Sequence, residues 1–185
     1  MSTHDLNRPS RLRVLTAIVE DHPGVLSRVS GMVRRRGFNI QGLSVGPTAV
    51  PGRSRMTLTV DAGHAEVDQV EKQLDRLVEV IEIEDLTEAR RINRELALVT
   101  LAPGQAKREA ARAEAESFGG RVVDEHPEQL IVELSGEFDR VERALEALRP
   151  YQIVDLARSG PVAISQIVKS GQPERPPAAA GGVAR

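Results

Sequence analysis

The order of secondary-structure elements, which the chain runs through twice, is the strongest constraint on its fold. Residues 11–20 are apolar on both faces of an extended strand, which predicts the central strand of a sheet. From residue 25 to about residue 37, apolar residues recur at helical spacing. The other predicted elements of the first half are strands at 38–45 and 55–61, a helix at 67–77 and a strand at 79–84.

The second half repeats this order more faintly. Its predicted strands and helices are, in turn, strands at 95–101, 121–124, 130–134 and 153–157, with helices at 107–117 and 138–148. This order is that of a ferredoxin-like βαββαβ unit, in which both helices cover one face of an antiparallel sheet. The predicted fold class is therefore α+β, with two tandem ferredoxin-like units.

The domain boundaries follow from composition. The first unit is expected to span residues 11–86 and the second residues 95–168, joined by residues 87–94, a mixed-charge linker that could form a short helix. Residues 1–10 and the Pro-, Gly- and Ala-rich residues 169–185 are expected to be disordered, because they offer little apolar surface to bury.

The strand at 55–61 alternates apolar and polar residues, the pattern of a strand with one buried face. Met56, Leu58 and Val60 are expected to face a core. The polar residues that alternate with them are expected to face water: Thr57, Thr59 and Asp61.

Charge and composition exclude several classes of function. The 185 residues include 25 Lys and Arg against 27 Asp and Glu, so the excess positive charge typical of nucleic-acid binders is missing. There is no cysteine, which removes disulfides, thiol nucleophiles and cysteine-ligated metals. No apolar run approaches the roughly 20 residues that span a bilayer. We expect a soluble, cytoplasmic protein without a nucleic-acid or membrane partner.

The common catalytic patterns are also missing from the sequence. It has no Gly-rich phosphate loop, no nucleophile elbow and no pair of histidines at metal-ligand spacing. The four scattered histidines are interpreted as surface residues: His4, His22, His64 and His126. Glu82 and Glu84 share a strand face and are interpreted as a solvated charged edge rather than an acid–base pair. We therefore expect no catalytic residue, no metal and no cofactor on this chain.

One junction, residues 21–26, has the features of a ligand site. Asp21 is a possible helix cap, Pro23 suits a first helical turn, and Gly24 lets a ligand approach the free N–H groups closely. These groups and the helix dipole favour a carboxylate, while Asp21 or the amide oxygen of Asn39 could accept from an ammonium group. An aliphatic side chain could pack on the apolar residues nearby: Val25, Leu26 and Ile40. The alternative is an ordinary helix start that binds nothing.

These residues are similar to a known family, the small regulatory subunits of acetolactate synthase, also called acetohydroxyacid synthase. The matching stretches are residues 21–28, 35–40, 43–48, 54–56, 69–74, 95–98 and 157–160. The first is shared by amino-acid-binding ACT domains in general, whereas residues 35–40 and 43–48 in this order are more specific. The resemblance covers about residues 11–168.

The resemblance implies an N-terminal ACT domain followed by a C-terminal, ACT-like small-subunit domain. In this family two ACT domains pair side by side, and a branched-chain amino acid, typically valine, binds between them. The effector site would combine residues 21–26 of one chain with Asn39 and Ile40 of its neighbour. Asp21 stands where the family often has Asn, and Gln166 replaces an expected basic residue. The second half lacks an Asp/Asn-x-Pro-Gly junction after Leu101, so no second effector site is expected there.

The implied function is regulation of a separate catalytic large subunit, which the small subunit activates and makes sensitive to feedback inhibition. That large subunit would carry thiamine diphosphate, magnesium and FAD. Three alternatives stay open from the residues. One is a stand-alone ACT sensor acting on another enzyme or regulator. The others are an RNA-binding ferredoxin-like protein, disfavoured by only three Phe, one Tyr and no Trp, and an acylphosphatase-like hydrolase, which lacks a convincing active site.

Overall fold

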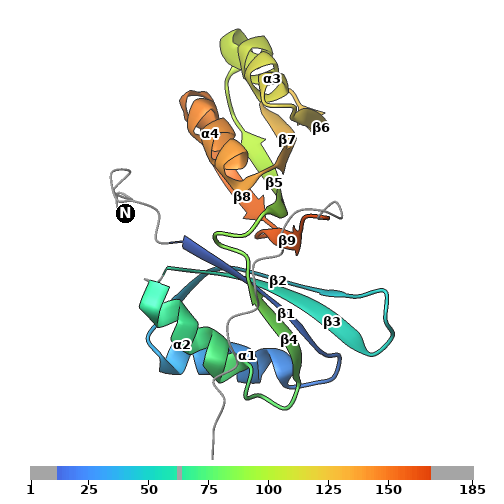
Figure 1. Ribbon diagram of the computed structural model, residues 1–185. Helices are drawn as coiled ribbons and strands as arrows, with labels where there is room; N and C mark the ends of the chain where they lie inside the picture. The colour runs from blue at the N-terminus through green and yellow to red at the C-terminus, as the bar shows by residue number, and fades with distance from the viewer. Residues whose placement is uncertain (1–11, 62–63, 168–185) are drawn as a thin grey trace, which may run out of the picture.

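The computed structural model describes residues 12–61 and 64–167, and these form two βαββαβ units in sequence (Figure 1). The predictions of disorder for residues 1–10 and 169–185 lie outside the described residues. In Figure 1 the first unit lies below the second, and strand β5 (Arg91–Leu101) rises from the first unit into the second. The prediction of two tandem α+β units is confirmed.

The first unit is a four-stranded antiparallel sheet with two helices on one face (Figure 1). Its strand order across the sheet is β2-β3-β1-β4, so β1 is central and β2 is an edge strand. The elements along the chain are β1 (Leu12–Glu20), α1 (Val25–Arg35), β2 (Asn39–Pro47), β3 (Arg53–Asp61), α2 (His64–Leu74) and β4 (Val80–Asp85).

The core of the first unit forms where both helices cover the sheet. Val29 and Val33, one turn apart on α1, are almost completely buried against Leu15 of β1 and Leu58 of β3. Leu74 of α2 is also fully buried in this core. Helix α1 ends after Arg35 because Gly37 adopts a positive φ of 78°, a conformation that favours glycine.

The second unit has the same topology, with strand order β6-β7-β5-β8. Its elements are β5, α3 (Arg108–Ser117), β6 (Arg121–His126), β7 (Gln129–Gly136), α4 (Phe138–Leu148) and β8 (Ile153–Arg158), with short 3₁₀ turns at Gln105–Lys107 and Arg149–Tyr151. Helix α4 has the predicted bounds. Helix α3 packs closely on the sheet because Ala111 and Ala115 face it, and Phe118 supplies further apolar surface.

The linker prediction is wrong in one respect. Residues 91–94 are not helical but form the first part of β5, which pairs antiparallel with β9 (Val162–Ser165). Strand β9 was not predicted at all. Each strand of this two-stranded ribbon depends on its partner, which lies about seventy residues away in the sequence, so no local pattern marks it.

The expected orientation of β3 is also wrong for two of its polar residues. Met56, Leu58 and Val60 face the helices, as expected. Thr57 and Thr59, however, are only 2% and 4% exposed, because the sheet is covered on its second face as well. Part of this cover comes from β9, whose Ala163 N–H reaches the hydroxyl oxygen of Thr57 at 3.4 Å.

An ion pair between a partly exposed arginine and a buried carboxylate holds together the end of the second unit nearest the first. The guanidinium of Arg158 in β8 donates to both carboxylate oxygens of Glu95 at 2.7 and 2.8 Å. Glu95 is 3% exposed, and Arg158 also pairs with Glu142 and lies 5.5 Å from the ring centre of Phe138. The hydrogen bond to Glu95 is the main reason that the pKa of Arg158 is raised. Strands β5 and β8 are therefore fastened to α4.

Exposed ion pairs tie α3 to β6 at the other end of this unit. Arg112 donates to Glu125 at 2.6 Å and Arg108 does so at 3.3 Å. Together these hydrogen bonds lower the pKa of Glu125.

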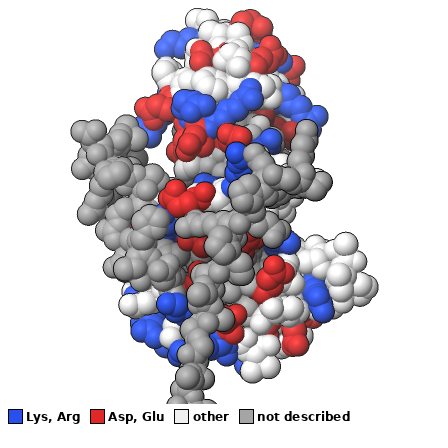
Figure 2. Space-filling model, viewed as in Figure 1, with Lys and Arg blue, Asp and Glu red and all other residues white. Residues whose placement is uncertain are grey.

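Figure 2 shows Lys and Arg interspersed with Asp and Glu over the described surface that it displays. Among the described residues, no helix is long and apolar enough to cross a membrane.

Candidate effector site

The junction between β1 and α1 has an open helix start. Gly24 occupies the cap position with φ 96° and ψ −18°, and the first helical hydrogen bond runs from Arg28 N–H to the Gly24 carbonyl at 3.0 Å. The cap expected from Asp21 is not formed, and no side-chain cap bond is present at this end among the described residues. The N–H groups of the first helical turn therefore point to a position that an anion can occupy.

The loop before this helix is held in place from both sides. The Asp21 N–H donates to the Gly52 carbonyl at 2.9 Å, which ties the loop to the turn between β2 and β3. His22 lies 3.1 Å from the carboxylate of Glu20. These contacts fix the loop before any ligand is present, which lowers the ordering cost of binding.

A buried carboxylate supports the first turn of α1. Glu79 is 7% exposed and forms an ion pair with Arg28. Its backbone carbonyl also accepts a hydrogen bond from Glu20 N–H at 2.9 Å. Glu79 therefore contacts both the end of β1 and the first turn of α1. Sequence reasoning missed Glu79, because it lies 51 residues from Arg28 and no local pattern relates them.

The apolar residues proposed for the site differ in what they can offer. Val25 is only 3% exposed and belongs to the core of its own unit, which leaves little of its surface for a ligand. Leu26, in contrast, is 43% exposed, and Ile40 is partly buried at the start of β2. An apolar wall would therefore come from Leu26 and Ile40.

The two parts of the proposed site lie at opposite ends of one sheet. Strands β1 and β2 are both antiparallel to β3, so they run in the same direction. Asn39 and Ile40 begin β2, whereas Asp21 follows the end of β1 beside the β2–β3 turn. The nine residues of β2 span about 26 Å at the usual rise per residue. One chain therefore does not bring Asn39 and Ile40 to the Asp21–Gly24 loop.

The corresponding junction of the second unit also contains a Pro-Gly pair, but Gly104 has ψ 163° where Gly24 has ψ −18°, so the backbone takes a different course. Gly104, after Pro103, has φ 66°, yet a 3₁₀ turn separates it from α3. Leu101, a buried apolar residue, stands where the first unit has Asp21, so this junction offers no carboxylate to an ammonium group. In the part of the chain that the structure describes, no group of three or more His, Cys, Asp or Glu side chains could hold a metal ion.

The first unit, with two helices on one face of a β2-β3-β1-β4 sheet and an open glycine junction after β1, has the architecture of an ACT-type ligand-binding domain. A family model described as an acetohydroxyacid synthase small subunit-like ACT domain matches residues 15–82. A second, described as the small subunit of acetolactate synthase, matches residues 94–167. The chain belongs to the family of acetolactate synthase small subunits.

Individual relatives agree over nearly their whole length. The chain is 40% identical over 154 residues to a probable acetolactate synthase small subunit of Methanothermobacter thermautotrophicus, covering 83% of this chain and 92% of that protein. It is also 40% identical over 152 residues to the small subunit of Mycolicibacterium smegmatis, covering 82% and 89%. The crystal structure of the Thermotoga maritima small subunit superposes with a TM-score of 0.76 at 32% identity, covering 85% and 99%.

Proposed function

We propose that this chain is the regulatory subunit of an acetolactate synthase, which activates a catalytic large subunit and makes it responsive to valine or another branched-chain amino acid. The observation that carries the proposal is that family models for both halves of such subunits match the two units in the expected order. The open junction at Gly24 supports the effector role of the first unit. The proposed place of action is the cytoplasm.

A homodimer would complete the effector site. Within the described residues, strand β2 pairs only with β3 and forms an edge of its sheet, and two such edges can pair antiparallel about a two-fold axis. This pairing would bring Asn39 and Ile40 of the partner subunit close to the Asp21–Gly24 loop, because each chain holds these elements at opposite ends of β2. The separation within one chain thus supports a site shared between two chains.

The chemistry of such a site suits an α-amino acid. The ligand carboxylate would accept from the N–H groups at the start of α1, where Gly24 leaves room. Its ammonium group would face the carboxylate of Asp21 or the amide oxygen of the partner's Asn39. An aliphatic side chain would lie against Leu26 and the partner's Ile40, which are the available apolar surfaces.

Regulation then requires that the effector bind two arrangements of the complex unequally. An amino acid that bound the active and inhibited arrangements with equal affinity would shift nothing. The thiamine diphosphate, magnesium and FAD that the chemistry needs would be held by the large subunit. This chain would contribute the effector site and the contact to its partner.

The test is acetolactate formation by a purified large subunit, with and without this chain and with and without valine. Stimulation by the chain that valine then suppresses is the expected result. Valine binding by the chain without any stimulation of the large subunit would favour a stand-alone ACT sensor with another partner. Neither binding nor stimulation by folded protein would remove both the partner and the effector site.

A further inference from the structure

Two stretches that are far apart in the sequence, residues 42–44 and 159–161, meet across the two units. The Ser44 hydroxyl donates to the Ser159 carbonyl at 3.0 Å. Gly160 has φ 69° and lies so near that a Cβ there would be 3.4 Å from the backbone nitrogen of Leu43. We call this contact between residues 42–44 and 159–161 the cross-unit junction.

Gly42 makes the closest approach in the cross-unit junction. A Cβ at Gly42 would lie 2.9 Å from Cδ of Pro161, a distance that real side chains do not tolerate. The register of β2 against β3 shifts between Ile40 and Gly42, which leaves Gln41 without a facing residue in the described sheet. Such a bulge bends the strand and interrupts its pairing with β3 between Ile40 and Gly42. Gly42 therefore lies just beyond the segment that would contact an effector.

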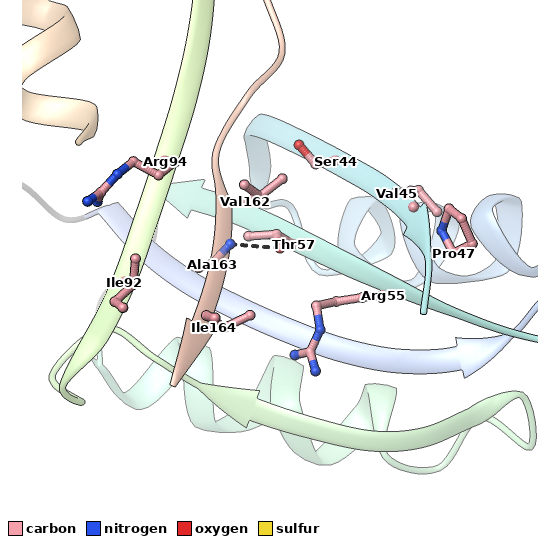
Figure 3. A pocket seen from close by; sticks show the side chains of 11 residues that line it. Ser44, Val45, Pro47, Arg55, Thr57, Ile92, Arg94, Val162, Ala163 and Ile164 are labelled. Carbon is pink, nitrogen blue, oxygen red and sulfur yellow. Dashed lines mark hydrogen bonds between the residues drawn. The ribbon is translucent and has the colours of Figure 1, made fainter. Parts of the chain in front are cut away.

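Beyond Pro161, strand β9 crosses the face of the first sheet that the helices leave open (Figure 3). Figure 3 shows Ala163 beside Thr57, where its N–H meets the Thr57 hydroxyl oxygen at 3.4 Å. Ala163 packs in a small buried cluster with Val14 and Leu86. Ser165 then donates to Glu84 in β4. The strand thus contacts the first sheet as far as β4, the edge opposite β2.

The other side of the cross-unit junction is fastened to the second unit. The Ser159 N–H donates to the Leu96 carbonyl at 2.9 Å, and the Ser159 hydroxyl accepts from Leu96 N–H at 3.1 Å. The neighbouring Arg158 forms the ion pair with the buried Glu95. Displacement of residues 159–161 would therefore move β5 and β8, the middle and edge of the second sheet.

We propose that the cross-unit junction is the coupling element of this protein. Effector contact at Asn39 and Ile40 moves the start of β2, Gly42 and Ser44 carry this movement to residues 159–161, and the second unit shifts with them. The inference rests on the proposed function, since it assumes an effector at the start of β2. It assigns a role to the two family-like stretches, residues 43–48 and 157–160, that the effector site does not use.

The first test is Gly42→Ala, with Gly46→Ala as the matched control. Both glycines lie in β2 and neither has a positive φ, but a Cβ at Gly46 has no described atom within 4 Å. Valine affinity is measured by calorimetry, and inhibition by acetolactate formation with the large subunit. Gly42→Ala is expected to keep valine affinity within about 2-fold of wild type while maximal inhibition falls by at least half. Gly46→Ala is expected to match wild type in both.

Two further variants separate coupling from damage to the fold. Ser44→Ala removes the hydrogen bond to Ser159 without adding volume and is expected to weaken inhibition in the same direction. Adding Pro161→Ala to Gly42→Ala removes the ring atom that the new methyl group meets, and is expected to restore inhibition. Restoration would show that the close contact itself, and not the composition of β2, carries the effect.

The outcomes distinguish this inference from the proposed function. Wild-type protein that neither binds valine nor confers inhibition would contradict the proposed function. If the wild type does both, the coupling role would be overturned by Gly42→Ala and Ser44→Ala variants that still give full inhibition by valine. Loss of valine affinity in step with loss of inhibition would overturn it too, because the variants would then act on the site itself.

Discussion

Replacement of Gly24 by Asp places a negative charge at the point where the effector carboxylate would bind. Gly24 has φ 96°, and a Cβ built there has no described atom within 4 Å, so the aspartate meets open space rather than a clash. Two effects remain. One is the strain of a left-handed backbone, about 1–2 kcal/mol for a residue with a side chain. The other is repulsion between the two carboxylates.

The repulsion sets the expected loss of affinity. Two like charges about 4 Å apart cost roughly 1 kcal/mol in water and about 4 kcal/mol near a partly buried protein surface. Because 1.4 kcal/mol is tenfold in affinity, valine binding should weaken between about 5-fold and about 1000-fold. Backbone strain could distort the loop and weaken valine binding even without any charge repulsion. A control variant must therefore separate the strain from the repulsion.

Gly104→Asp supplies that control. Gly104 has φ 66°, precedes the first helical turns of the second unit, and also has no described atom near a built Cβ. It carries the same added charge away from the proposed site, and its backbone, with φ 66° and ψ 163°, strains a residue with a side chain at least as much as that of Gly24 does. In the valine titration of acetolactate formation, Gly24→Asp should keep stimulation of the large subunit while the half-inhibitory valine concentration rises at least about 5-fold. Gly104→Asp should leave that concentration unchanged.

Two results would refute this reasoning. A half-inhibitory concentration that rises equally in both variants would attribute the effect to strain or net charge. An unchanged value in Gly24→Asp, with the variant folded, would mean that no carboxylate binds at the start of α1. Loss of stimulation together with inhibition would indicate misfolding, which the thermal melting of the variant checks.

Three further predictions concern the second unit and are checked by thermal or urea unfolding followed through its single tyrosine. Arg158→Met leaves the buried carboxylate of Glu95 unpaired and should lower the free energy of unfolding by about 3 kcal/mol, part of which Glu95→Gln in the same chain should recover. Gly120→Ala places a Cβ 2.7 Å from Cδ2 of Leu134 and should cost about 1–3 kcal/mol, whereas full stability would show that the strand yields freely. Arg112 and Arg108 lower the pKa of Glu125 in the folded state, so the stability that they add should be fully present above the unfolded pKa of the carboxyl and be lost as the pH falls through its folded pKa. Glu125→Gln should flatten this pH dependence. An equally steep loss of stability in that variant would contradict the prediction.

Much of the fold could be predicted from the sequence, because most elements carry a local pattern. Helix α4 was predicted with its observed bounds, since Val141, Leu145 and Leu148 recur at helical spacing and are buried. Strand β1 was predicted as central because both of its faces are apolar, and it does pair with β3 and β4. These patterns arise from the contact that each element makes with its own core.

The features that the sequence did not reveal depend on contacts between the units. Thr57 was expected to face water because its neighbours alternate with it, but the residue is buried beneath β9. Residues 91–94 were expected in a linker because they are charged and polar, but they pair with β9. A strand of four residues has too few side chains to carry a periodic signal, so only its partners define it.

The candidate site divides in the same way. The residue types at Asp21, Gly24, Asn39 and Ile40 were recognisable in the sequence, because a glycine junction before an apolar helix and a known family pattern are local features. Their separation, the burial of Val25 and the brace from Glu79 were not, since these depend on strand direction and long-range packing.

Local patterns along the chain were enough to predict the two βαββαβ units and the family, because periodic burial and turn chemistry depend on neighbouring residues. The way in which the two units are joined could be learned only from the folded molecule. The contact of Ala163 in β9 with Thr57, the approach of Gly42 to Pro161 and the Ser44–Ser159 hydrogen bond link residues more than one hundred positions apart. Such contacts are set by the complementary shapes of two folded surfaces, which come into existence only once each unit has formed its own core.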